Sequence, residues 1–206
     1  MMSPKSKQSV LQKLKIDFKQ NPLQQKFAIE ICDQMSKRTL SSLNFEEFKD
    51  FILLLYDFFI VENHSKAFVY LGNPALHSKS LTNTFILKMA QPDAQHLLFT
   101  LEEVFRKYQL RTSRRLHPIF GIHRNDKKEI VDLVSAKNSN ERRSLIFTAF
   151  EFIDPSKSAQ ILNDIKFHMK AVQIAENDQD AIQKKLIHIK QQLNESRSSQ
   201  SVEWTK

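Results

Sequence analysis

The chain has 206 residues, a formal net charge of +8 and 41% hydrophobic residues, a composition that supports a globular protein of one or two domains. It contains only two glycines, Gly72 and Gly121, which lie far apart in the sequence. Because the dinucleotide-binding fingerprint, the P-loop and the nucleophile elbow each need glycines close together, the sequence excludes all three kinds of site.

Residues 1–63 are predicted to form an N-terminal helical subdomain, because their apolar residues recur at helical spacing. The Asn21-Pro22 pair separates the first two helices, and Ser42 and Asn44 are both plausible caps for a third. This third helix is apolar on nearly all sides, which indicates a buried position. The apolar stripes of the first two helices consist of Leu11, Leu14 and Phe18, and of Leu23, Phe27, Ile31 and Met35.

Residues 64–154 are predicted to form a small α+β subdomain. Short runs rich in Val, Ile, Phe, Tyr and Thr, bounded by turn residues, are typical of strands. A helix that starts at an Asp93 cap and runs to about Tyr108 separates the second strand from the third. This order of elements favours an α+β fold with a mainly antiparallel sheet. The predicted strands cover residues 66–71, 81–89, 116–123, 130–134 and 145–153.

Residues 155–193 are predicted to form a pair of C-terminal helices. Asp154-Pro155 supplies a cap followed by a proline at the first helical position. Asn177-Asp178 interrupts the apolar stripe and predicts a break between the two helices. Residues 194–206 are rich in Ser and Gln, and we expect them to be a flexible tail at a domain boundary.

A basic segment accounts for most of the net charge. Between residues 106 and 143 there are eleven Lys and Arg residues against four Asp and Glu residues. Such a cluster can bind phosphates of nucleic acid, and it can equally form a solvated face or meet an acidic neighbouring domain. No glycine-rich loop, aromatic RNA-binding pattern or recognition helix accompanies it, so nucleic acid is the less favoured reading. The candidate basic patch consists of Arg106, Arg111, Arg114, Arg115 and Arg124.

The sequence predicts no catalytic or metal site. His117 and His123 would stand about 20 Å apart on an extended strand, too far to bind one ion. The single cysteine, Cys32, lies near an apolar helical stripe and is interpreted as a core residue in a reducing, cytoplasmic setting. No segment has the length of a membrane-spanning helix or the features of a signal peptide.

Three segments resemble the N-terminal region of the large NAD-specific glutamate dehydrogenases. Residues 116–124 contain His-Pro-Ile-Phe, which is similar to the family's His-Pro-Val-Leu before a basic strand. Residues 145–154 resemble the later strand of that family that ends in His-Ile-Glu-Ile-Asp, and Val69–Pro74 resembles its Val-Tyr-Asn-Pro turn. The resemblance rests on the order and spacing of these short motifs and extends from Leu23 to Leu193.

In that family, this region resembles an ACT-type regulatory module ahead of the catalytic and nucleotide-binding domains. The resemblance implies a parent enzyme that oxidises L-glutamate to 2-oxoglutarate and ammonia with NAD, and a noncatalytic chain that itself holds no cofactor. It further implies contacts with other domains or subunits of a homo-oligomer, and a possible amino-acid effector.

ACT modules hold their effector at the turn between a strand and the following helix, where N–H groups at the helix start can receive a carboxylate. The resemblance therefore implies that a ligand would bind at the corresponding turn of this chain, which consists of Asp93, Ala94, Gln95 and His96. Helix capping by Asp93 is the structural alternative for the same turn. The alternative function is a stand-alone basic interaction protein that binds nucleic acid or an acidic partner.

Overall fold

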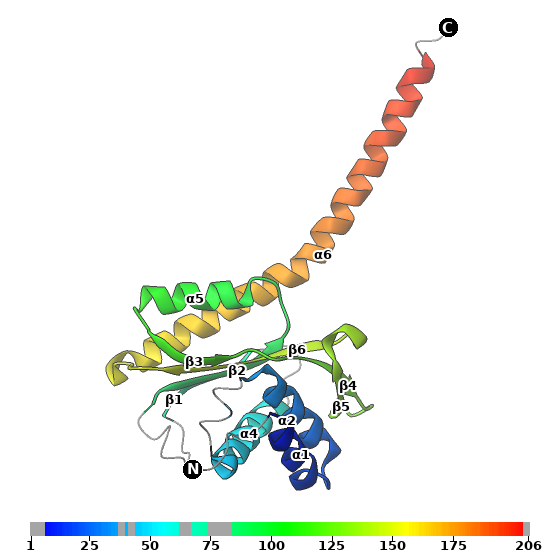
Figure 1. Cartoon of the computed structure of the whole chain (residues 1–206). Coiled ribbons are helices and arrows are strands. Elements are labelled where there is room, and N and C mark those ends of the chain that lie inside the picture. Colours follow the sequence, from blue (N-terminus) through cyan, green and yellow to red (C-terminus); the bar gives the residue numbers. More distant parts are fainter. Residues whose placement is uncertain (1–6, 37–39, 41–43, 62–66, 74–83, 204–206) are drawn as a thin grey trace.

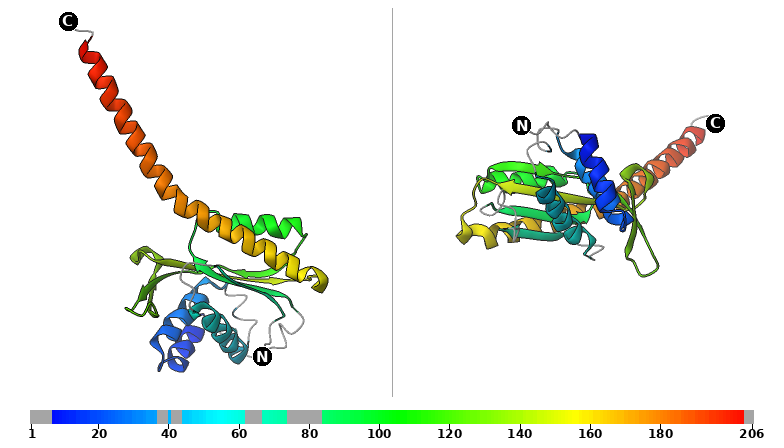
Figure 2. Two further views of the ribbon diagram at one scale, coloured as in Figure 1. Left: turned by 180° about the vertical axis from the view of Figure 1, so that it is seen from behind. Right: turned by 60° about the horizontal axis from the view of Figure 1, so that its bottom comes forward.

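The computed structural model describes residues 7–36, 40, 44–61, 67–73 and 84–203, and it has three layers (Figure 1). A central sheet carries N-terminal helices on one face and two later helices on the other (Figure 2). The first helical layer contains α1 (Lys7–Asp17), α2 (Pro22–Gln34) and α4 (Phe45–Ile60). The second contains α5 (Leu97–Lys107) and the beginning of α6 (Ser158–Glu203), which then extends away from the body.

All the strand pairs of the sheet are antiparallel within the described residues. The strand order is β1-β2-β6-β4-β5, and β3 also pairs with β6. One edge of β6 pairs with β2. Its other edge pairs with β4 at the beginning of the strand and with β3 farther along, because His117-Pro118 interrupts what would otherwise be one strand. The strands are β1 (Phe68–Gly72), β2 (Ile86–Pro92), β3 (Thr112–Leu116), β4 (Ile119–Arg124), β5 (Ile130–Ser135) and β6 (Arg142–Phe150).

Side-chain caps determine where α2 and α4 begin: Asn44 was predicted as a cap, whereas Asn21 was predicted only as part of a break between helices. Asn21 accepts a hydrogen bond from the backbone N–H of Gln24, and Pro22 occupies the first position of α2. Asn44 accepts from the N–H of Glu46 at the start of α4. Each bond satisfies an N–H group that the helix itself leaves without an acceptor. The other predicted cap of α4, Ser42, lies outside the described residues.

The sheet separates two hydrophobic cores because successive side chains of a strand point to opposite faces. On the first face, Phe27 stacks on Phe120 with the ring centroids 5.1 Å apart, and Phe59 packs against both rings. On the second face, α5 and α6 cover alternate residues of β2 and β6. These second-face residues include Leu87, Met89, Ile146 and Phe150, packed with Leu101, Val104, Ile161, Ile165 and Met169.

The α+β class and the antiparallel sheet are confirmed. Its relation to ACT modules and the division into domains stay predictions. The predicted strand 116–123 corresponds to β4 and shares only Leu116 with β3, so β3 itself was not predicted. The predicted strand 81–89 begins only at Ile86, although residues 81–83 lie outside the described part.

The predicted helical pair was wrong, because α6 is one helix from Ser158 to Glu203. No glycine or proline occurs within it. Asn and Asp inside a helix cost only a few tenths of a kcal/mol each, so Asn177-Asp178 lowers helix propensity without ending the helix. The predicted tail is helical to Glu203, and residues 204–206 lie outside the described chain.

The two glycines provide a matched test of the sheet. A Cβ on Gly121 would lie 2.7 Å from the carbonyl oxygen of Ser135, whereas a Cβ on Gly72 would meet only the hydroxyl end of the Tyr70 side chain at 2.9 Å. We expect Gly121→Ala to lower the free energy of unfolding by about 1–3 kcal/mol, since the backbone of β5 must shift. Gly72→Ala should stay within about 0.5 kcal/mol of the original chain. Urea unfolding followed by circular dichroism measures both, and equal losses would contradict this account.

Candidate functional site

The turn between β2 and α5 forms one wall of an open pocket of about 410 Å³. All four predicted ligand-binding residues line it, and the structure adds residues from β4, the β3–β4 connection and the start of β6. The pocket therefore brings the predicted turn together with side chains that are distant in sequence. The full lining consists of Asp93, Ala94, Gln95, His96, Leu97, Leu98, Phe99, His117, Ile119 and Arg142.

Asp93 does not cap α5, so the capping alternative is wrong. The helix begins at Leu97, and its N-cap residue is His96, which has a left-handed backbone (φ 60°) and no capping hydrogen bond from its side chain. Because α5 lacks a side-chain cap, no capping side chain accepts a hydrogen bond from the N–H groups of its first turn. The first-turn residues Leu97, Leu98 and Phe99 line the pocket. The resulting partial positive charge favours an anion at this end of the helix.

The Asp93 carboxylate is held by β6 instead. Ser144 Oγ donates to Asp93 Oδ1 at 2.7 Å, and Arg142 Nε lies 3.7 Å from the other carboxylate oxygen. His117 Nε2 lies 3.1 Å from the same Ser144 hydroxyl. Since the hydroxyl hydrogen goes to Asp93, the imidazole must donate through Nε2–H. The Ser144 hydroxyl therefore lies between the Asp93 carboxylate and the His117 imidazole. In a hydrolase triad the imidazole lies between the other two groups, so this arrangement is not a triad.

Two further polar side chains lie buried on the same face of the sheet. Gln91 is opposite Ser144 in the β2–β6 register, and Thr148 is four residues farther along β6. Both residues are 0% exposed. The amide of Gln91 and the hydroxyl of Thr148 have no hydrogen-bond partner within the described residues. This part of the sheet is therefore more polar than an ordinary core.

Helix α6 holds the turn from the other side. Glu176 Oε2 accepts from the backbone N–H of Gln95 at 3.0 Å, and Gln173 Nε2 donates to the carbonyl oxygen of Pro92 at 3.0 Å. We call these two bonds the α6 clasp. They couple the position of the candidate ligand turn to the point where α6 leaves the body (Figure 1).

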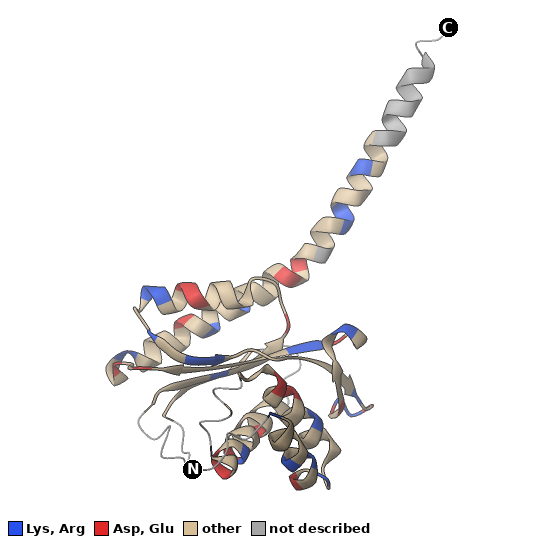
Figure 3. Cartoon of the chain, viewed as in Figure 1, with Lys and Arg blue, Asp and Glu red and all other residues tan. Residues whose placement is uncertain are grey.

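The predicted basic residues belong to several elements of the fold. They are distributed over α5, β3, β4 and the chain just before β3, interspersed with acidic residues (Figure 3). Three of the five contact carboxylates, in the pairs Arg106–Glu103, Arg115–Glu102 and Arg124–Glu141. Another arginine of the basic segment, Arg143, is buried with its guanidinium 5.6 Å from the centre of the Phe59 ring, and burial lowers its pKa to about 10.

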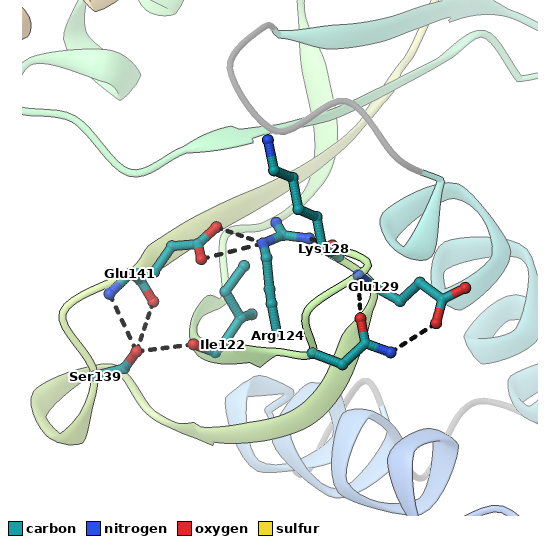
Figure 4. Close-up of polar contacts among 7 residues, drawn as sticks. Ile122, Arg124, Lys128, Glu129, Ser139 and Glu141 are labelled. Atoms are coloured by element: carbon teal, nitrogen blue, oxygen red, sulfur yellow. Dashed lines mark hydrogen bonds and ion pairs between the residues drawn. The ribbon is translucent and has the colours of Figure 1, made fainter.

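A second pocket, of about 420 Å³, is lined in part by the predicted basic residue Arg124. Figure 4 shows the polar contacts of this arginine. Arg124 Nε donates to both carboxylate oxygens of Glu141, at 2.8 and 3.1 Å, and its Nη1 donates to the carbonyl oxygen of Lys128. Ser139 Oγ lies within 3.0 Å of the carbonyl oxygens of Ile122 and Glu141. These bonds tie the β5–β6 connection to the β4–β5 hairpin, which is a structural role for Arg124.

The other sequence candidates lie apart. His117 is in the β3–β4 break, whereas His123 is exposed on β4 opposite Asp132. Within the described ranges, no three His, Cys, Asp or Glu side chains are grouped so as to hold a metal ion. Cys32 is fully buried in the N-terminal core, and burial raises its pKa to about 11. Among the helices described, none has the length and apolar character to cross a membrane.

Sequence reasoning missed Ser144, Arg142, Gln173 and Glu176 as members of this site. They lie roughly 50 to 80 residues from the turn in sequence, and only the strand register and the path of α6 bring them to it. No local motif marks them. The turn itself was predicted from the family resemblance.

Comparison with known proteins gives this chain no relatives: no family model, no curated protein and no solved structure matches it.

Cys32 should be chemically inert in the folded chain. With a pKa of about 11, about one thiol in a thousand is a thiolate at pH 8, and the sulfur is also enclosed by the core. We expect a thiol-reactive dye to label Cys32 at least 100-fold faster in 8 M urea than in buffer at pH 8. Rapid labelling of the folded chain would show that the thiol is accessible.

His117 should make the folded chain less stable in acid. Burial lowers the pKa of its imidazole from the ordinary value of 6.5, so the unfolded state binds more protons as the pH falls below that value. The free energy of unfolding should therefore decrease between pH 7 and pH 5, and His117→Gln should make that decrease smaller. Urea unfolding at several pH values measures it, with His188→Gln on the exposed part of α6 as the control. An unchanged pH dependence in His117→Gln would contradict this role.

Proposed function

We propose that this chain is a noncatalytic ligand-binding and assembly module, of the kind that stands at the N-terminus of an NAD-dependent glutamate dehydrogenase. The parent reaction and its NAD belong to that proposal, which the sequence resemblance supports. The observation that carries the ligand-binding part is the pocket at the β2–α5 turn. There a carboxylate, a guanidinium and the uncapped start of a helix face the same space.

The ligand that this combination suits best is a free α-amino acid. Its carboxylate would accept hydrogen bonds from the first-turn N–H groups of α5 and from Arg142, and its ammonium would lie against Asp93. Asp93 is only 14% exposed and already fixed by Ser144, so its carboxylate is oriented before a ligand arrives. Arg142 is about half exposed and can turn toward a bound carboxylate. Leu98 and Ile119 offer apolar surface to a side chain.

The α6 clasp supports a regulatory role for this binding. A ligand that shifts the turn between Pro92 and Gln95 must stretch or break the bonds to Gln173 and Glu176. Binding energy at the pocket would thereby act on the orientation of α6. A ligand can shift such an equilibrium only by its difference in affinity between the two positions of the turn.

The alternative function, binding of nucleic acid or an acidic partner, is supported by net charge alone. Most of its candidate residues already contact carboxylates within the chain. Nucleic-acid binding needs several cations that are available to phosphates on one surface. The geometry of the described residues therefore favours the small-ligand proposal.

Titration calorimetry with L-amino acids tests the pocket. We expect heat of binding from at least one of them at millimolar concentration, and none from the corresponding amine that lacks the carboxylate. Arg142→Gln should weaken binding by roughly 10- to 100-fold, the usual effect of losing a hydrogen bond to a charged group. Arg106→Gln, at the far end of α5, is the matched control and should bind like the original chain. No heat with any amino acid would overturn the ligand-binding proposal.

The glutamate dehydrogenase part has its own test. The reading frame that encodes the chain can be followed beyond Lys206. A continuation into a glycine-bearing nucleotide-binding region, with NAD-dependent oxidation of glutamate by the full-length product, would support it. A stop codon directly after Lys206 would overturn it and leave the pocket proposal standing.

A further inference from the structure

The outer half of α6 carries a narrow apolar stripe. Beyond the α6 clasp, every residue from 177 to 193 whose side chain the structure describes is exposed. Ile182 is 58% exposed, Leu186 61% and Ile189 44%, and Leu193 continues the same spacing. By contrast, Ile161, Ile165 and Met169 at the start of the same helix are buried against the body.

The spacing of this stripe is that of a coiled coil. The steps from Ile182 to Leu186, Ile189 and Leu193 are four, three and four residues, so these side chains occupy alternate a and d positions of two heptads. At 100° per residue they fall within a band of about 60° around the helix. Lysine and glutamine flank this band at positions 183, 185, 190 and 192, as is usual beside a coiled-coil seam.

We propose that this stripe pairs with the same stripe of a second copy of the chain in an antiparallel two-stranded coiled coil. The pairing is self-complementary, because a two-fold axis places Leu186 against the partner's Ile189 and, equally, Ile189 against the partner's Leu186. The proposal does not rest on ligand binding at the β2–α5 turn.

Charge selects the antiparallel orientation. In a parallel pair, Lys185 of one copy would lie beside the partner's Lys190, and two like charges at flanking positions repel. In the antiparallel pair, Lys185 lies beside the partner's Gln192, and Lys190 beside the partner's Gln183. No like charges then face each other along the seam.

The length of α6 also fits this arrangement. With the two-fold axis between positions 187 and 188, residue 203 of one helix is level with residue 172 of the other, close to where that helix leaves its body. In this arrangement the two bodies stand at opposite ends of the coil. The seam is short, so we expect a reversible dimer that forms at micromolar concentrations rather than a permanent one.

Sedimentation velocity of the full chain from 2 to 200 µM tests the dimer. We expect the mass to rise from 24.2 kDa toward twice that value with concentration. The double variant Leu186→Ser/Ile189→Ser should lower the association constant at least 10-fold. Ile187→Ser is the matched control, since Ile187 is 52% exposed but points away from the stripe, and it should change the constant less than twofold. Circular dichroism verifies that each variant remains helical.

Disulfide trapping tests the orientation in a Cys32→Ser background. Leu186→Cys and Ile189→Cys chains should form a mixed disulfide when they are combined, and neither should form a strong disulfide with itself. Efficient self-linkage of each single variant would indicate a parallel pair and overturn the antiparallel proposal. In the sedimentation experiment, a chain that stays monomeric at 200 µM would overturn pairing with a second copy. Equal association of the Leu186→Ser/Ile189→Ser variant would overturn it as well. In either case the stripe would be left for a different binding partner.

Discussion

Burial of β6 on both faces and pairing along both edges is the constraint on which the rest of the structure depends. Every residue of this strand after Arg142 is buried. Leu145, Phe147 and Ala149 face the N-terminal helices, and Ile146 and Phe150 face α5 and α6. Such a strand cannot stand at the surface, so both helical layers are needed to remove its apolar side chains from water. The layer order of the whole chain follows from this one strand.

The same strand places the candidate site. Ser144 lies near the beginning of β6 and pairs with Gln91 of β2. Both side chains are polar and buried, and the buried polar Thr148 lies farther along β6. A buried polar group without a hydrogen bond costs about 1–3 kcal/mol, which is a large fraction of the stability of a typical domain. Natural sequences keep such departures from an apolar core mainly near functional positions. The polar stretch leads directly to Asp93 and the pocket, which is where we place ligand binding.

Local patterns predicted the elements whose boundaries are set by local chemistry. The caps Asn21 and Asn44 start α2 and α4 because a side-chain oxygen reaches an N–H group only two or three residues away. The same reasoning failed at Asn177-Asp178, where weak helix formers do not outweigh the many good ones around them in α6. It could not reach the bond from Ser144 to Asp93 either, because strand register brings together residues 51 positions apart. The spacing of apolar residues shows which face of a helix or strand is buried, but it does not show which other helix or strand covers that face.

The unbroken course of α6 makes it a lever. Between Glu176, where the α6 clasp holds it, and Glu203, the helix rises about 40 Å at 1.5 Å per residue. A tilt of α6 by about 10° at Glu176 would displace Glu203 by roughly 7 Å, while the atoms of the α6 clasp would move by only a fraction of that distance. A rod with no hinge residue transmits such a rotation along its whole length instead of absorbing it. Events at the sheet can thus be amplified into large displacements far from it.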